Sequence, residues 1–254
     1  MNVNGLAAIV TGGASGMGAE TARALAAAGA KVTVMDVNED GINDVAKEIG
    51  GLAVQCDVTS ADSAEAAVAK AKAAHGAARV LVNCAGIAPA KRIVGRDGPM
   101  PLDDFTKVIN VNLVGTFNLM RLVAADLYGE EPLDDIGERG VIVNTASVAA
   151  FEGQIGQAAY SASKGGIVAL TITAARDLSG KGIRVMTIAP GFIATPMLLG
   201  MPQEVQDSLA QQTPFPKRFG RADEYAGLVM HIVGNQMLNG DVIRLDGAAR
   251  MQAK

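Results

Sequence analysis

The sequence is poor in the residues that build metal sites and disulfide frameworks. Its 254 residues include two cysteines, two histidines and no tryptophan. Cys56 and Cys84 both end apolar runs, where a thiol behaves as a small hydrophobic group, so we expect reduced, structural thiols. His75 and His231 have no Cys, Asp or second His at ligand spacing, so no metal is expected.

The chain also lacks a basic excess, a block of like charges and a long apolar segment. Its formal net charge is −4, which argues against a nucleic-acid partner. Since no apolar stretch approaches the roughly 20 residues that cross a bilayer, no membrane partner is expected. Regular structure begins by Leu6, which leaves no room for a targeting peptide and predicts a cytoplasmic location.

Short apolar runs alternate with longer helical patterns along the whole chain. The runs are rich in β-branched residues without polar alternation, which is typical of strands buried on both faces. Strands are expected at residues 6–11, 31–36, 52–56, 80–83, 141–145, 184–188 and 242–245, and helices at 16–28, 42–49, 61–75, 102–127, 157–178 and 222–233. This order predicts a single α/β domain over residues 1–254, with a Rossmann-type, doubly wound parallel sheet of about seven strands and helices on both faces.

A glycine run, Gly12-x-x-x-Gly16-x-Gly18, follows the first expected strand and opens the first helix. Glycines at this place allow a tight turn and let the backbone approach a pyrophosphate, which the helix N-terminus attracts through its free N–H groups. The sequence therefore predicts a dinucleotide-binding loop, with a plain loop as the alternative.

Polar and small residues end the next three strands. Asp36 ends the second strand, where an acid accepts the ribose hydroxyls of adenosine and repels a 2′-phosphate. Ser15 and Val37 stand where a basic residue would neutralise that phosphate, so the sequence predicts NAD rather than NADP. A carboxylate that only caps the next helix is the alternative. Further cofactor contacts are expected from Asp57, Val58, Asn83, Ala85 and Gly86.

Tyr160 and Lys164 are four residues apart on an expected helix, so their side chains share one face. An ammonium at roughly 5 Å favours the phenolate by about 3 kcal/mol, which brings the phenol into range for general acid–base catalysis. Ser147 follows the fifth strand and is expected to bond the substrate oxygen, while Asn112 is expected to hold a water beside Lys164. A surface helical pair is the alternative, which the glycine run, Asp36 and Ser147 together disfavour.

Over its full length the sequence resembles the short-chain dehydrogenase/reductase family. The residues that carry this resemblance are 11–18, Asp36, Asp57, 83–86, Asn112, Ser147, Tyr160, Lys164, Pro190, Gly191 and Thr195. More narrowly, segments 141–164, 182–190 and 238–251 are similar to the type 2 3-hydroxyacyl-CoA dehydrogenases, also called 17β-hydroxysteroid dehydrogenase type 10. The resemblance implies an NAD-dependent homotetramer that oxidises 3-hydroxyacyl-CoA thioesters. It also implies that the cofactor site includes Met17, Tyr160, Lys164, Pro190, Gly191, Ile193 and Thr195.

The segment 191–216 follows a strand end, where α/β sheets place their ligands. Its prolines and apolar side chains are typical of a lid over an apolar substrate, although a packed surface loop is the alternative. Residues expected to line the substrate side are Ala149, Phe151, Gln154, Gln157, Phe192 and Leu198. Candidate cations for a CoA phosphate are Lys91 with Arg92, or Lys217 with Arg218, each with solvated surface as the alternative.

Three functions remain open from the sequence. The first is interconversion of a 3-hydroxyacyl-CoA and a 3-oxoacyl-CoA, and the second is an NAD-dependent hydroxysteroid or secondary-alcohol dehydrogenase. The third is a nucleotide-binding scaffold whose catalysis is incidental. The helix expected at 157–178 is apolar on most faces, so it predicts a partner subunit opposite its own sheet, and with the resemblance a homotetramer.

Overall fold

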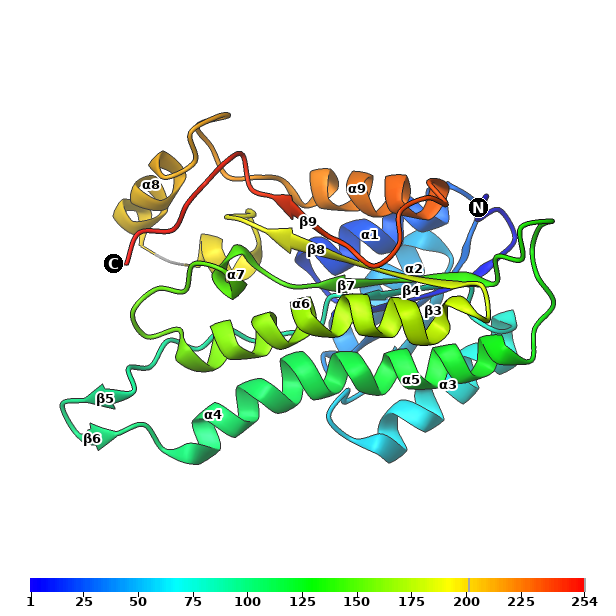
Figure 1. The fold of residues 1–254 in the computed structure, drawn as a ribbon, viewed down its shortest axis with the longest axis horizontal. Helices are drawn as coiled ribbons and strands as arrows, with labels where there is room; N and C mark the ends of the chain where they lie inside the picture. Colours follow the sequence, from blue (N-terminus) through cyan, green and yellow to red (C-terminus); the bar gives the residue numbers. More distant parts are fainter. Residues whose placement is uncertain (201, 254) are drawn as a thin grey trace.

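In the computed structural model, which describes residues 1–200 and 202–253, seven strands form one parallel sheet (Figure 1). The strand order is β3-β2-β1-β4-β7-β8-β9. The strands are β1 (Ala7–Thr11), β2 (Lys31–Asp36), β3 (Leu52–Gln55), β4 (Val80–Asn83), β7 (Gly140–Thr145), β8 (Ile183–Pro190) and β9 (Val242–Leu245). The predicted doubly wound sheet is confirmed, and its seven strands span residues 7–245.

Helices cover both faces of this sheet (Figure 1). One face carries α1 (Gly16–Ala27), α2 (Glu39–Ile49) and α9 (Ala222–Gly234). The other carries α3 (Ala61–His75), α5 (Gly115–Tyr128) and α6 (Ala158–Ser179). Ahead of α5 come α4 (Leu102–Ile109) and the π-turn η1 (Asn110–Val114), and a 3₁₀ turn, η2 (Val148–Ala150), follows β7.

Each central strand contributes to two hydrophobic cores. In β1, Ala8 and Val10 pack with α1, α2 and α9, while Ile9 between them packs with α3 and α5. Successive side chains of a strand point to opposite faces, and here both faces are covered by helices. The unbroken apolar runs in the sequence follow from this double burial.

The helical run Leu102–Tyr128 corrects one expectation. It comprises α4, η1 and α5, and by length and composition its 27 residues suffice to cross a membrane. The prediction that no apolar stretch approaches that length is therefore wrong. Of the most apolar 18-residue stretch of this run, 50% is buried inside the molecule. The buried core helix of a globular protein meets the same criteria of length and hydropathy.

Two segments outside the expected strands and helices contain short regular elements. Residues 89–101 include a small hairpin of β5 (Val94–Gly95) and β6 (Gly98–Pro99). The predicted lid, 191–216, contains α7 (Pro196–Leu199) and α8 (Gln203–Gln211), and its Met201 lies outside the described residues. The assignment of this segment as a lid stays a prediction.

Candidate active site

A cavity of about 570 Å³ lies at the carboxyl ends of the strands. The strand order reverses between β1 and β4, the point where doubly wound sheets bind nucleotides. The predicted site residues that line this cavity are Gly12, Ser15, Gly16, Met17, Gly18, Asp36, Asp57, Val58, Ala85, Gly86, Ser147, Ala149, Gln154, Gln157, Tyr160, Lys164, Pro190, Gly191, Phe192, Ile193, Thr195 and Leu198. The fold thus brings most of the predicted site into one space.

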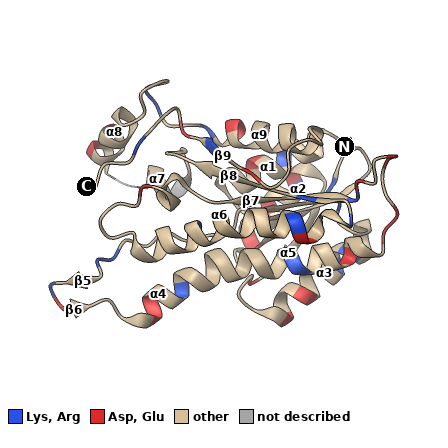
Figure 2. Ribbon diagram, in the orientation of Figure 1, with Lys and Arg blue, Asp and Glu red and all other residues tan. Residues whose placement is uncertain are grey.

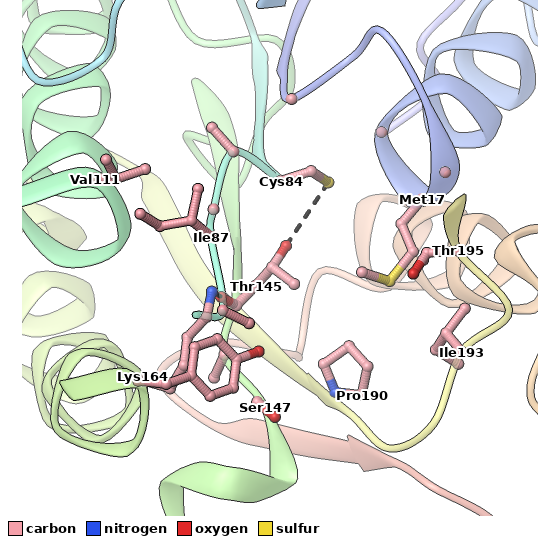
Figure 3. A pocket seen from close by; sticks show the side chains of 18 of the residues that line it. Met17, Cys84, Ile87, Val111, Thr145, Ser147, Lys164, Pro190, Ile193 and Thr195 are labelled. Carbon is pink, nitrogen blue, oxygen red and sulfur yellow. Dashed lines mark hydrogen bonds between the residues drawn. The ribbon is translucent and has the colours of Figure 1, made fainter. Parts of the chain in front are cut away.

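Figure 3 shows how two groups of side chains face each other in the cavity. Lys164 and Ser147 lie on one side, and Met17 and Thr195 lie on the other, with Pro190 between them in this view. The residues expected to transfer a proton therefore share the cavity with the glycine loop.

The glycine loop lies directly against the end of β4. At Gly12 the backbone φ is 63°, and a Cβ there would lie 2.6 Å from the backbone nitrogen of Ala85. A Cβ on Gly18 would lie 2.2 Å from the carbonyl oxygen of Gly12. Both distances are too short for a carbon atom, so glycine is required for α1 to start this close to the sheet.

The N-terminus of α1 faces the cavity. Its cap residue Ser15 and its first residues Gly16 and Met17 all line the cavity wall. Within the described residues, the Ser15 side chain makes no cap bond and the first turn holds no acid. Free N–H groups at a helix N-terminus favour a phosphate, so residues 12–18 fit the pyrophosphate of a dinucleotide.

Asp36 is held at the end of β2 by two backbone groups. Ala14 donates its N–H to Oδ2 over 3.3 Å, and Asn38 donates its N–H to Oδ1 over 3.1 Å. Of the described residues that line the cavity, Lys164 is the one cation. An acid in this position suits the two ribose hydroxyls of an adenosine.

Asp57 and Val58 line the cavity after β3, as predicted. Thr59 donates its N–H and its hydroxyl to Oδ1 of Asp57 over 2.9 and 2.8 Å. The Asn118 amide donates to the carbonyl oxygen of Val58 over 2.9 Å. These bonds hold the turn into α3 in place, so its backbone forms a fixed part of the wall.

Asn83 does not reach the cavity, contrary to prediction. Its amide donates to Oδ1 of Asn144 over 2.9 Å and to the carbonyl oxygen of Thr116 in α5 over 3.5 Å. The residue is 3% exposed and faces the helix layer, because its position in the strand points it away from the loop side. Asn83 therefore ties β4 to β7, and its neighbours Ala85 and Gly86 line the cavity instead.

Tyr160 and Lys164 lie one turn apart at the start of α6. The Lys164 Nζ is 5.8 Å from the Tyr160 ring centroid and donates to the carbonyl oxygen of Thr145 over 2.7 Å. The side chain of Ser147 lies close enough to the Tyr160 phenol to influence its pKa. The three predicted residues thus form one contiguous group at the end of β7.

Burial governs how this group titrates. It raises the pKa of Tyr160 above the usual 10.0, and the side chain of Ser147 acts in the opposite direction. Burial also lowers the pKa of Lys164 from 10.5 to about 8. The net shift of the phenol pKa is therefore opposite to the one expected from the ammonium alone, because the apolar surroundings disfavour charge on both residues.

Asn112 sits in the π-turn η1, an element that often marks functional sites. Ile87 donates its N–H to Oδ1 over 2.8 Å, and Nδ2 donates to the Ile87 carbonyl over 2.9 Å and to Ser163 Oγ over 3.0 Å. Both N–H groups of the amide are therefore engaged. The side chain clamps the chain after β4 against α6, and the water-holding role expected for Asn112 stays a prediction.

Phe151 does not belong to the cavity wall, contrary to prediction. Its side chain is 49% exposed, and its ring lies 5.5 Å from the guanidinium of Arg244. The turn η2 ends just before it and directs the ring outward. The other residues predicted for the substrate side do line the cavity, as described above.

Several lining residues were not predicted. They include Ile87, Val111, Thr145, Leu209 and Met251. Ile87 follows the motif residue Gly86 directly and Thr145 lies two residues before Ser147, so their position near a motif was a usable signal. Leu209 and Met251 come from distant segments that only the fold brings to this place.

Comparison with known proteins gives consistent results. The profile of the family described as short chain dehydrogenase matches residues 6–205. A human protein named 3-hydroxyacyl-CoA dehydrogenase type-2 is 53% identical over 99% of this chain and 97% of that protein. A Drosophila melanogaster protein of the same name is 52% identical over 96% of each chain. The crystal structure of 3-hydroxyacyl-CoA dehydrogenase type-2 from Mycobacterium avium is similar with a TM-score of 0.94, at 46% identity over 98% of each chain.

Proposed function

The chain belongs to the short-chain dehydrogenase family, and from that premise we propose that it interconverts a 3-hydroxyacyl-CoA and a 3-oxoacyl-CoA with NAD. Membership of this family makes it an oxidoreductase that uses a nicotinamide cofactor. The observation that carries the proposal is the single cavity shared by the glycine loop and the group of Ser147, Tyr160 and Lys164.

The residues of this group divide the work on the substrate oxygen. When bound beside this group, NAD would supply the chemistry of hydride exchange with the substrate carbon. In oxidation Tyr160 accepts the hydroxyl proton, and in reduction its raised pKa supplies a protonated phenol that donates this proton. Ser147 donates a hydrogen bond to the same oxygen, and the ammonium of Lys164 stabilises the charge that develops on Tyr160.

The preference for NAD rests on the end of β2. The Asp36 carboxylate, fixed by the N–H groups of Ala14 and Asn38, would repel a 2′-phosphate at close range. Val37 beside it is 62% exposed and brings no charge to neutralise such a phosphate.

The thioester assignment is supported by the relatives, which carry the name 3-hydroxyacyl-CoA dehydrogenase type-2. Apolar side chains of Phe192, Leu198 and Leu209 line the cavity and suit an acyl group. Arg218 makes a two-bond ion pair with Glu224, and Lys91 pairs with Asp104, so each carries its own counter-ion. Arg92 and Lys217 remain the stronger candidates for contact with a CoA phosphate.

A secondary-alcohol or hydroxysteroid dehydrogenase is the second candidate. The observation that favours it is the pairing of two of the four candidate cations with carboxylates, because a CoA phosphate needs free cations and a steroid does not. A scaffold with incidental catalysis is the third, and it has no specific support from the cavity.

A homotetramer is part of the proposal. Its support is the outer face of α6, where the exposed residues Ala162, Ala169, Ile172 and Thr173 carry no charge. Apart from the buried Lys164, the charged residues of this helix lie near its C-terminal end (Figure 2). The cytoplasmic location, the absence of a membrane or nucleic-acid partner and the single-domain division stay predictions.

The test is the rate of NADH oxidation with acetoacetyl-CoA, run beside NADPH, a steroid ketone and the variant Tyr160→Phe. We expect turnover with NADH and the thioester, and a loss of about 10²-fold or more in kcat for the variant, since it cannot donate the proton. The variant should bind NADH as the wild type does, measured by quenching or transfer of NADH fluorescence.

Each other outcome points to a different function. Turnover of the steroid ketone without the thioester would replace the first candidate by the second. The scaffold function would be supported if the wild type bound NADH but reduced no ketone. In that case the variant Tyr160→Phe should also replace the wild-type protein in cells without loss of function.

A further inference from the structure

The chain that follows β9, residues 246–253, returns to the cavity. Figure 1 shows this segment in red, ending on the same side of the molecule as α8. Its Met251 is half-buried and lines the cavity together with Gln154, Leu198 and Leu209, which come from three other segments. The substrate end of the cavity is therefore completed by a segment that holds none of the predicted site residues.

Hydrogen bonds join this segment to the loop between η2 and α6. Ile155 donates its N–H to the carbonyl oxygen of Ala253 over 3.0 Å. The Gln154 amide donates to the carbonyl oxygen of Gln252, also over 3.0 Å. The loop that carries Gln154 and Gln157 is thus held by the segment that carries Met251.

A small charge cluster reinforces this connection, with Glu152 at its centre. The Glu152 carboxylate accepts the N–H of Met251 over 3.0 Å and pairs with Arg244 over 2.9 Å. Arg250 lies 3.3 Å from the same carboxylate, and Arg244 also donates to the carbonyl oxygen of Ala249 over 3.0 Å. Glu152 therefore fixes the backbone of Met251 directly.

We propose that Met251 is a specificity-determining residue that limits the size of the substrate's acyl group, and that Glu152 is the positioning residue that holds it there. The inference rests on the proposed reduction of a carbonyl compound in this cavity. A methionine suits the role because its long, unbranched side chain fills irregular apolar space. The ring of Phe151, stacked on Arg244, belongs to the same support.

The first test compares Met251→Ala and Met251→Phe on acetoacetyl-CoA and 3-oxooctanoyl-CoA. We expect the ratio of kcat/KM for the longer over the shorter substrate to rise about tenfold with Ala and to fall about tenfold with Phe, the lower end of the discrimination that one methylene group produces in an apolar pocket. Met237→Ala is the matched control, since that side chain is 92% exposed. NADH affinity should stay at the wild-type value in all three.

An unchanged ratio in both Met251 variants would overturn the inference. The same proteins are assayed on 2-alkanones of increasing length, so that failure of the thioester assignment is told apart from failure of the size limit. If the Met251 variants turn over no thioester but show a shifted ratio of kcat/KM for long over short alkanones, the proposed function is wrong and the size limit stands. A wild-type protein that reduces no ketone of either series would overturn both the proposed function and the size limit.

The second test asks whether Glu152 acts through Met251. Glu152→Gln keeps an acceptor for the Met251 N–H but removes the charge that attracts Arg244 and Arg250, so the size ratio should shift in the same direction as in Met251→Ala. We expect the shift to come from KM, with kcat for acetoacetyl-CoA kept within about twofold. In the double variant the ratio should equal that of Met251→Ala, because residues acting as one unit are not additive. Full additivity would show that Glu152 has only a general structural role.

Discussion

Among single residues, Lys164 combines a charge with almost complete burial. Its side chain is buried against β7, and its pKa is lowered from 10.5 to about 8 by that burial. Between these two pH values the unfolded chain binds a proton that the folded chain does not. The free energy of unfolding therefore rises as pH increases from about 8 to about 10.5, and below pH 8 the buried ammonium costs about 3 kcal/mol.

Replacing Lys164 by Met should separate stability from activity. We expect Lys164→Met to lose turnover, and its stability relative to the wild type to be highest near pH 7 and to decline as pH rises above about 8. The gain in the free energy of unfolding at pH 7 is smaller than the cost of burying the ammonium, because Met leaves the Thr145 carbonyl oxygen without its hydrogen-bond donor. Urea denaturation across this pH range measures the effect.

The exposed Lys70, changed to Met, is the control for loss of one positive charge. A stability difference for Lys164→Met that does not vary with pH would contradict the prediction.

The roles of residues could be predicted where a motif sets their spacing. They were predicted less well where the direction of a side chain changes from one residue to the next. Tyr160 and Lys164 share a helix face because they are one turn apart, and the structure brings both to the cavity. Asn83 and Cys84 are adjacent on a strand end, yet only Cys84 lines the cavity. Phe151 follows a 3₁₀ turn, whose exit direction leaves no periodic pattern in the sequence.

Among the elements, the loop between β1 and α1 makes the sharpest demand on sequence. A methyl group at Gly12 meets the Ala85 nitrogen at 2.6 Å and also requires φ of 63°. We expect Gly12→Ala to weaken NADH binding and to lower the free energy of unfolding by about 1–3 kcal/mol or more. Fluorescence titration and thermal denaturation measure the two effects.

Gly50 provides a matched control for this substitution. Its φ is 64°, but a Cβ there has no atom within 4 Å among the described residues. Gly50→Ala should therefore show the cost of the backbone conformation alone, with NADH affinity kept. Equal losses of NADH affinity in the two variants would refute the role of close approach at Gly12.

The long helix before β7 shows what a pattern reveals of an element. Its apolar periodicity predicted one helix over 102–127, and the structure has helical residues from 102 to 128. The π-turn inside it was not predicted, because it depends on tertiary bonds such as those from Asn112 to Ile87. The hairpin of β5 and β6 is too short to leave an alternating pattern.

At the scale of the whole molecule, the outer face of α6 is the feature without a partner inside the described chain. Its Ile172 side chain is 43% exposed, and Ala169 lies exposed at the middle of the helix. An uncharged helix face of this kind is typical of a contact between subunits. We expect Ala169→Arg to lower the molar mass in solution, measured by light scattering after size-exclusion chromatography.

Ala66→Arg on α3 introduces the same side chain at another exposed helical position and should leave the mass unchanged. A wild type that is already monomeric would rule out the proposed tetramer.

The fold class was predictable because strands that are buried on both faces need continuous apolar runs in the sequence. The outer limit of the cavity was not predictable, since Leu209 and Met251 come from segments that only the tertiary fold brings to it.

The bond between Met251 and Glu152 has a consequence for the order in which the molecule opens. It joins chain positions 99 residues apart, while the nucleotide loop is held by neighbouring parallel strands in the middle of the sheet. Contacts at the periphery with few buried apolar neighbours open before those of the central sheet in local unfolding. Mild denaturant should therefore abolish discrimination among substrates at concentrations where the protein still binds its dinucleotide. Substrate selectivity and dinucleotide binding should then be lost at different denaturant concentrations.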